Sequence, residues 1–149
     1  MPRSVQAETI AHFIDEVLVD CPQCRGLAVV LAPGGLRAKS PALSCSGCGF
    51  NRSGWPNGAS IPPSIRLGEP FDPYFGYPLR LQKPLGREVL WAYNRRHLAF
   101  LRAFIGAGIR PKTPHANASL ASRLPAWMKK ATRRAHLLKG IASLEKQLG

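Results

Sequence analysis

The chain has 149 residues, 45% of them hydrophobic, and a formal net charge of +13 at pH 7. This length suits one modest domain or two small ones, and no apolar run reaches the ~18 residues that a membrane-spanning helix requires, which argues against a membrane protein. With 14 glycines and 14 prolines, the chain favours short elements joined by tight turns over long uninterrupted ones.

The first twenty residues hold four of the eight acidic residues and are predicted to include a short helix. They lack the basic leader and apolar run of a secretory signal. We therefore expect a cytoplasmic protein, in a compartment where disulfides are disfavoured. Most cations lie further along, since no acid occurs from Val89 to Leu144 while basic residues are frequent there. A field of this sign attracts polyanions such as nucleic acid.

All the cysteines fall in one stretch, as two pairs with two residues inside each pair and twenty between the pairs: Cys21, Cys24, Cys45 and Cys48. A disulfide framework would need an oxidising compartment, and a thioredoxin-like redox motif would leave the second pair unexplained. Four thiolates around one Zn²⁺ account for both pairs, because each tight turn aims two sulfurs at the same ion. A closed four-sulfur shell leaves no position for water or substrate, so the predicted zinc is structural.

Short antiparallel strands are predicted between the two cysteine pairs. Leu27–Leu31 is apolar and rich in β-branched residues, Pro33-Gly34-Gly35 forms a turn, and a second extended run leads to Cys45. Proline presets φ and glycine permits positive φ, so Pro22 and Gly49 suit the turns that carry the sulfurs. The pattern predicts two strands with a metal-binding turn at the base of each.

These turns resemble the two knuckles of the zinc-ribbon superfamily, which occurs in transcription factors of the IIB type, polymerase subunits and ribosomal proteins. The resemblance is carried by Cys21-Pro22-Gln23-Cys24 and Cys45-Ser46-Gly47-Cys48-Gly49. It implies a ribbon fold and one zinc ion, but no particular activity. One residue departs from the pattern, because Arg25 stands where glycine often follows the second cysteine. We expect this departure to affect the geometry of the first turn and not its zinc binding.

The segment after the second knuckle is dense in proline, glycine and aromatic residues. We expect an ordered connector whose rings pack the two halves together, and the alternative is an exposed platform on which single-stranded bases stack. Two pieces, Asp72-Pro73-Tyr74-Phe75-Gly76 and Leu90-Trp91-Ala92-Tyr93-Asn94, are similar to parts of small bacterial zinc-ribbon proteins, and this resemblance implies no activity.

The second half is predicted to fold as a β-hairpin followed by helices. Leu79–Gln82 and Glu88–Tyr93 alternate around a turn at Lys83–Gly86. Asn94 is placed to cap a helix from Arg95 to about Gly106 or Gly108. The hairpin and helix have the outline of a treble-clef metal module, but they contain no cysteine and are interpreted as metal-free.

Further helices are predicted towards the C-terminus. On the Arg95 helix, His97 is interpreted as a packed or hydrogen-bonded residue at the edge of the apolar face. A short helix begins after Asn117, another has Pro125 in its first turn, and Thr132 is placed to cap a last helix with leucines at helical spacing. The apolar face of this last helix needs a partner, which is the Arg95 helix, a second copy of the chain or another protein.

The predicted architecture is therefore α+β in three parts. Residues 1–54 form a zinc ribbon with a short N-terminal helix, residues 55–78 form the connector, and residues 79–149 form the hairpin and a basic helical region. This combination predicts a non-enzymatic protein that binds nucleic acid through a basic surface, with regulation as one role it could serve. Lys and Arg side chains would neutralise phosphates and release counterions, so binding should weaken with salt.

The candidate nucleic-acid contacts lie near the ribbon tip, just after the second knuckle and on the helices: Arg37, Lys39, Arg52, Arg95, Arg102, Lys129, Lys130, Arg133 and Arg134. Two other functional classes stay open. An adaptor or inhibitor could dock an acidic surface of a partner protein, with the basic face speeding the encounter.

An enzyme is the least supported class. No Gly-rich phosphate loop, nucleophile elbow or His-Glu-x-x-His pattern occurs in the sequence. A nuclease that uses His97, His115 or His136 would lack a visible carboxylate metal site. No small-molecule substrate is predicted.

Overall fold

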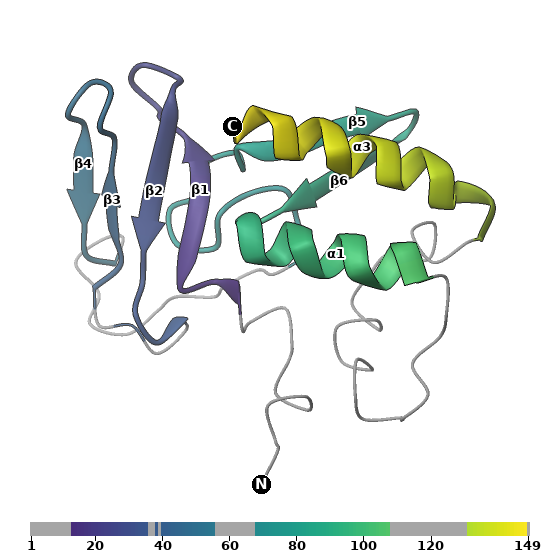
Figure 1. Ribbon diagram of the computed structural model, residues 1–149. Coiled ribbons are helices and arrows are strands. Elements are labelled where there is room, and N and C mark those ends of the chain that lie inside the picture. The colour runs from purple at the N-terminus through teal and green to yellow at the C-terminus, as the bar shows by residue number, and fades with distance from the viewer. Residues whose placement is uncertain (1–12, 36–37, 39, 56–67, 108–130, 149) are drawn as a thin grey trace, which may run out of the picture.

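The computed structural model describes residues 13–35, 38, 40–55, 68–107 and 131–148. The protein is α+β, as predicted. Strands β1 to β4 form an antiparallel sheet in sequence order, and their bounds are Glu16–Asp20, Leu27–Leu31, Ala42–Ser44 and Asn51–Ser53. Strands β5 and β6 form a second sheet, and helices α1 and α3 follow, with bounds Leu81–Leu85, Glu88–Ala92, Arg95–Ala107 and Arg134–Gln147. Figure 1 shows the larger sheet on one side and the hairpin with both helices on the other.

Strand β1 was missed by the sequence interpretation, which placed only a helix before the cysteines. Its central residues form a continuous apolar run, which suits a strand that is buried on both faces. One edge of β1 pairs with β2. At the other edge, the Leu18 N–H donates to the Tyr93 carbonyl at 2.8 Å and the Leu18 carbonyl accepts from the Arg80 N–H at 2.9 Å. Strand β1 therefore joins the cysteine-bearing sheet to the second half of the chain.

Aromatic rings cover the inner face of the larger sheet. Trp55 is buried and its Nε1–H donates to the Ala38 carbonyl at 3.2 Å, while its ring lies 5.5 Å from that of Tyr74. The Tyr74 hydroxyl donates to the Ile14 carbonyl at 2.7 Å. The prediction that rings of the connector pack the two halves together is confirmed for the described residues, and residues 56–67 lie outside them. Phe71 is an exception, with 46% of its surface exposed.

The hairpin turns later than predicted. Strand β5 runs through Pro84 to Leu85, which pairs with Glu88, so the loop is Gly86-Arg87. Gly86 has a φ of 70° and Arg87 has no positive φ, the pattern of a type II′ turn, which suits a two-residue hairpin. Pro84 is tolerated because pairs alternate between hydrogen-bonded and non-hydrogen-bonded in an antiparallel ladder, and Pro84 occupies a non-hydrogen-bonded position.

Helices α1 and α3 run antiparallel to each other (Figure 1) and pack on the hairpin, and Leu18 of β1 belongs to the same core. The core between these elements is apolar and buried, and it contains Leu18, Leu81, Leu85, Leu90, Leu98, Leu101, Ile105, Leu137, Ile141 and Leu144. The predicted apolar face of the last helix therefore packs against α1, one of the three partners considered. Neither described helix has the length and apolar character that crossing a membrane requires.

The start of α3 differs from the prediction. A single 3₁₀ turn, Ala131–Arg133, leads into the helix, and Arg133 occupies the N-cap position without a side-chain capping bond. The prediction that Thr132 caps this helix is wrong, because the chain enters the helix through an already helical turn. The helices predicted after Asn117 and at Pro125 lie outside the described residues.

The predicted cap of α1 is confirmed. The Asn94 Oδ1 accepts the His97 N–H at 2.9 Å, and in return the Tyr93 N–H donates to the His97 Nδ1 at 3.0 Å. The Asn94 amide also donates to the carbonyls of Phe13 and Glu16, both at 2.6 Å. His97 is only 2% exposed, and therefore lies in the core and not at its edge. Burial lowers the pKa of His97 to about 3, so the side chain is neutral at pH 7.

Replacing His97 with glutamine should flatten the acid dependence of stability. Between its unfolded pKa near 6.5 and its folded pKa of about 3, His97 takes up a proton only on unfolding, so wild-type stability falls as the pH falls through that window. Urea titrations at pH 7 and pH 5.5 should show a loss of about 1 kcal/mol that His97→Gln lacks. Equal losses in both proteins would contradict the assigned protonation state.

Candidate metal centre

Two tight turns carry the four cysteines, and they share one backbone pattern. In the first turn, which follows β1, the Cys21 N–H donates to the Gly26 carbonyl at 2.7 Å, and the Arg25 N–H donates to the Cys21 carbonyl at 2.8 Å. In the second turn, which follows β3, the Cys45 N–H donates to the Phe50 carbonyl at 2.9 Å, and the Gly49 N–H donates to the Cys45 carbonyl at 2.9 Å. The two turns therefore present their cysteines in equivalent positions.

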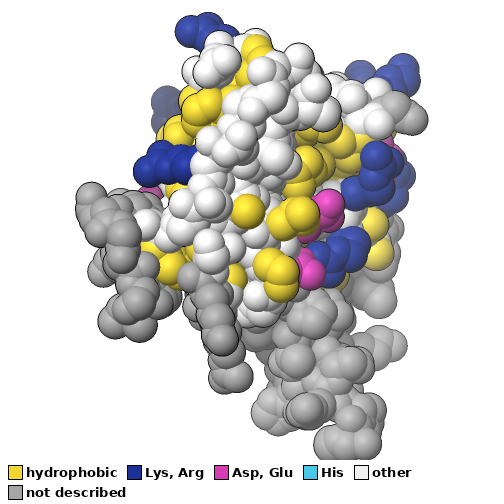
Figure 2. All heavy atoms as spheres, turned by 90° about the vertical axis from the view of Figure 1, so that its left-hand side faces the viewer, with side chains coloured by type: hydrophobic (Ala, Val, Ile, Leu, Met, Phe, Trp, Pro, Cys, Tyr) yellow, Lys and Arg dark blue, Asp and Glu magenta, His cyan; other side chains and the backbone are white. Residues whose placement is uncertain are grey.

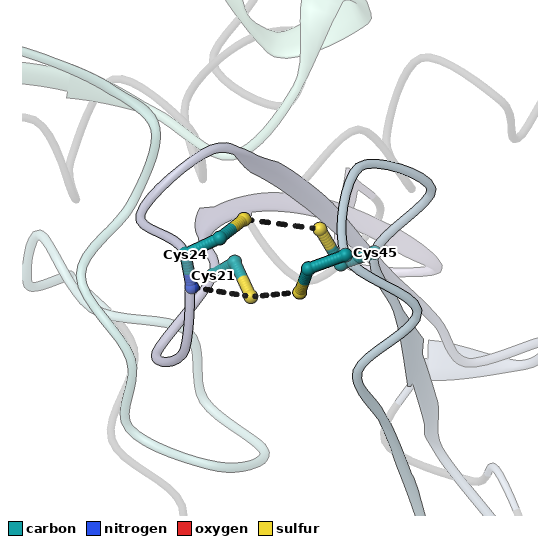
Figure 3. Close-up of side chains that lie close together, drawn as sticks. Cys21, Cys24 and Cys45 are labelled. Atoms are coloured by element: carbon teal, nitrogen blue, oxygen red, sulfur yellow. Dashed lines mark hydrogen bonds between the residues drawn. The ribbon is translucent and has the colours of Figure 1, made fainter.

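The four sulfurs converge on one point. The Cys21 and Cys48 sulfurs are 3.6 Å apart, the Cys24 and Cys45 sulfurs are also 3.6 Å apart, and all four lie within 4.8 Å of one another. Tetrahedral sulfurs at ~2.3 Å from a metal ion would be about 3.8 Å apart, whereas disulfide sulfurs are about 2.05 Å apart. Figure 3 shows Cys21 and Cys24 pointing across to Cys45. The four cysteines are free and could hold one metal ion.

Backbone amides stabilise negative charge on the sulfurs. Cys21 accepts the N–H groups of Gln23 at 3.3 Å and Cys24 at 3.4 Å, and Cys24 accepts the Gly26 N–H at 3.3 Å. Burial opposes ionisation of Cys21, but these amides and the neighbouring thiols lower its pKa to about 6. The Phe50 amide favours the Cys48 thiolate, yet burial and the other sulfurs raise the pKa of Cys48 to about 12.

These opposite shifts follow from crowding several thiols at one place. Once one sulfur ionises, the next must do so beside an existing negative charge. A divalent cation removes that penalty, because it is attracted to all four thiolates at once. Cys21 and Cys45 are buried, so the donors are fixed by the packed sheet. Four sulfur donors complete a tetrahedral shell, an arrangement that suits a structural ion.

Arg25 adopts a backbone conformation that glycine would adopt without strain. Its φ is 65°, and the matching residue of the second turn, Gly49, has a φ of 83°. Although arginine stands where glycine is usual, Arg25 itself adopts the left-handed conformation, and the first turn keeps the backbone pattern of the second. For a residue other than glycine this conformation costs about 1 kcal/mol.

Arg25→Gly and Gly49→Ala should therefore change stability in opposite directions. We expect Arg25→Gly to raise the free energy of unfolding by up to about 1 kcal/mol, and Gly49→Ala to lower it by a similar amount. Urea unfolding of both variants with the metal bound measures the difference. A loss of stability in Arg25→Gly would show that the arginine side chain supports the fold.

A third turn repeats the backbone pattern without cysteine. In Asp72–Tyr77, the first N–H donates to the carbonyl five residues ahead at 2.8 Å, and the N–H of Gly76 donates back to the Asp72 carbonyl at 3.1 Å. Gly76 has a φ of 83°, as at the equivalent Gly49. In the place of a thiolate, the buried Asp72 carboxylate accepts three N–H groups, from Tyr74 at 2.7 Å, Phe75 at 2.6 Å and Tyr77 at 2.7 Å.

This third turn was not recognised from the sequence, although its spacing was visible. Asp72-Pro73 matches Cys21-Pro22, and Gly76 matches the fifth residue of the cysteine turns. Burial raises the pKa of Asp72 above its ordinary value, and the amide donors only partly oppose this shift. The turn packs its Tyr74 into the sheet core, so it anchors the connector with a carboxylate where the other two turns use sulfur.

The candidate nucleic-acid contacts that the structure describes lie on β4, on α1 and at the start of α3. Arg52 lies over the rings of Phe75 and Tyr77, on the edge strand β4. Arg102 forms a two-point ion pair with Glu145, and Arg95 approaches the Leu148 carbonyl at 3.5 Å. Arg133 and Arg134 stand where α3 begins, and the remaining candidates fall outside the described residues: Arg37, Lys39, Lys129 and Lys130.

On the face in Figure 2, the Lys and Arg side chains lie in separate groups around the margin, with hydrophobic side chains between them. No protein-family model, curated protein or solved structure matches the chain, so the site is interpreted from its own geometry.

Proposed function

We propose that the chain is a non-enzymatic protein of the zinc-ribbon type that binds nucleic acid through cationic side chains. The observation that carries this proposal is the excess of basic over acidic residues, which gives a net charge of +13. The sequence has 21 Lys and Arg residues against eight acids, and three of the acids are each already engaged by one arginine, in Asp15–Arg96, Asp20–Arg80 and Glu145–Arg102. The field around the protein is therefore strongly positive and favours polyanions.

Zinc is the proposed metal because four thiolates in tetrahedral arrangement suit it. Binding free energy at such a site becomes folding free energy, which a short sheet with three-residue strands needs. The ion and four thiolates together carry about two negative charges, which leaves the protein strongly basic. Thiolate ligands persist in reducing compartments, so we also propose a cytoplasmic location.

Arg102 is a poor residue for testing this function, because it is paired with Glu145. Reversing the charge at Arg102 would place two carboxylates together at Glu145, and weakened binding could then reflect damage to the α1–α3 contact. Lys129→Gln combined with Lys130→Gln removes two of the candidate contacts and leaves the Arg102–Glu145 pair in place. The matched control is Lys146→Gln combined with Lys139→Gln, which removes the same charge from exposed positions of α3.

Binding should be measured on labelled single-stranded and duplex oligonucleotides over a series of salt concentrations. We expect affinity to fall steeply with salt, and the 129/130 double variant to lower the slope of log affinity against log salt by about one unit per lost phosphate contact. The Lys139→Gln, Lys146→Gln control should keep an affinity and a salt slope close to those of the wild type. Wild-type protein that binds neither oligonucleotide at low salt would overturn the proposed function.

An adaptor that docks an acidic partner protein is the second candidate. The observation that favours it is exposed apolar surface on β2, where Leu27 is 42% and Leu31 is 50% exposed. Single exposed leucines are common, but two on one strand face suit the apolar part of an interface. Nuclease treatment distinguishes the two functions, because an adaptor keeps its protein partner after the nucleic acid has been digested.

A further inference from the structure

The segment around the third turn carries three aromatic rings that are exposed or partly exposed. Phe71 immediately precedes Asp72 and is 46% exposed, and it pairs with Pro78 across an isolated bridge. Phe75 and Tyr77 belong to the same turn, and their ring centroids are 6.1 Å apart. Both rings are half-buried against the sheet core, which fixes them without covering them.

One arginine lies over the rings of this turn. The Arg52 guanidinium lies 4.8 Å from the Phe75 ring centroid and 5.9 Å from that of Tyr77, and its Nη1 donates to the Tyr77 hydroxyl at 2.7 Å. Arg52 is nevertheless exposed. A planar cation fixed in this way keeps one face and several N–H donors available, which suits stacking against a base or pairing with a phosphate.

A second arginine is presented at the rim of the metal centre. Arg80 follows the third turn, and its Nη1 donates to the Arg25 carbonyl at 3.2 Å and to the Asp20 carboxylate at 3.1 Å. Asp20 therefore offsets the charge of Arg80, whereas the exposed Arg25 side chain has no hydrogen bond or ion pair among the described residues. Arginine is kept in a left-handed conformation here although glycine would be unstrained.

These features favour single strands over duplexes. Ring faces can stack with bases only where the bases are unpaired and unstacked, as in single-stranded DNA or RNA. A duplex presents phosphates to arginines, but its stacked bases leave no free ring face for the exposed Phe71. An acidic peptide would pair with the arginines but would gain little from Phe71.

We propose that the segment from Phe71 to Arg80, with Arg25 and Arg52, is a binding site for single-stranded nucleic acid. Bases stack on Phe71 and Arg52, and phosphates pair with Arg25 and Arg52. This inference rests on the proposed function and adds a base-stacking site near the cysteine turns to the phosphate contacts that are tested at Lys129 and Lys130. The third turn is the rigid support, because its amides are held by the buried Asp72.

The test compares Phe71→Ala and Arg25→Gly with matched controls in binding labelled 20-mers of dT and rU. Leu31→Ala controls for loss of an exposed apolar side chain, since Leu31 is 50% exposed, and Arg87→Ala controls for loss of one exposed cation at the distant hairpin turn. We expect Phe71→Ala to weaken single-strand binding at least about fivefold, because one stacked base contributes about 1 kcal/mol or more. Arg25→Gly should weaken binding and lower the slope of log affinity against log salt by roughly 0.7, because it removes one phosphate contact. Both controls should bind like wild type.

The outcomes separate this inference from the function on which it rests. Wild-type protein that binds no nucleic acid overturns the proposed function itself. Wild-type protein that binds while both test variants match their controls leaves that function standing and overturns the site. Tighter binding to duplex, or full competition by poly-glutamate, also overturns the site. Loss of metal from Arg25→Gly would show that Arg25 serves the metal centre and would contradict its role as a phosphate contact.

Discussion

Replacing Cys45 with serine should release the metal and unfold the cysteine-bearing sheet. Cys45 is buried, and its sulfur lies 3.6 Å from that of Cys24, so serine would leave three thiolates and a poor fourth donor. Structural zinc contributes roughly 10–16 kcal/mol of apparent binding free energy at pH 7, which exceeds the total stability of most domains of this size. Metal analysis and circular dichroism of Cys45→Ser should show less than one metal per chain and lost β structure.

Ser46→Ala is the matched control for this experiment. Ser46 occupies the same turn, is exposed and offers no ligand to the cluster. The control should keep its metal and its urea midpoint. A Cys45→Ser protein with full metal content and an unchanged urea midpoint would show that the cysteine cluster does not support the fold.

Replacing Asp72 with alanine should destabilise the protein by about 3 kcal/mol or more without releasing the metal. The substitution removes the acceptor for the N–H groups of Tyr74, Phe75 and Tyr77, of which the first is buried and the other two are partly buried. Each buried donor left without a partner costs about 1–3 kcal/mol. Urea unfolding monitored by tryptophan fluorescence is a suitable measurement, because Trp55 packs on Tyr74 of this turn.

Two further variants make the Asp72 result specific. Asp72→Asn retains one acceptor oxygen but turns an amino group towards one of the donors, so we expect a smaller loss than with alanine. Asp15→Ala removes a half-exposed carboxylate whose partner is the exposed Arg96, and surface pairs contribute at most about 1 kcal/mol. If Asp72→Ala and Asp15→Ala had the same free energy of unfolding, the Asp72 carboxylate would not support its turn as the sulfurs support the other two.

The cysteine cluster could be predicted because the sequence spacing of the cysteines determines where their sulfurs lie in each turn. Two residues between the members of each pair place both sulfurs on one side of a tight turn, whatever lies around it. Helix α1 was equally accessible, since Asn94 caps it and Leu98, Leu101 and Ile105 repeat at helical spacing. Both features depend on residues that are close together in the sequence.

Features that depend on distant residues were missed. The short apolar run of β1 fits a helix or a strand, and only its hydrogen bonds to Tyr93 and Arg80 decide for a strand. The pairing of Arg102 with Glu145 joins two helices that are separated by residues outside the described structure. The third turn is local and its spacing is visible in the sequence, but it contains no cysteine to mark it, and its hydrogen bonds show its likeness to the other two.

The central claim is that one structural zinc ion, held by four cysteines, organises the sheet. Elemental analysis of the full chain, purified from cells without added metal, tests it most directly. We predict one zinc per chain, and loss of cooperative unfolding when a strong chelator removes it. A metal-free chain that unfolds cooperatively, at the same urea concentration with and without chelator, would contradict the claim.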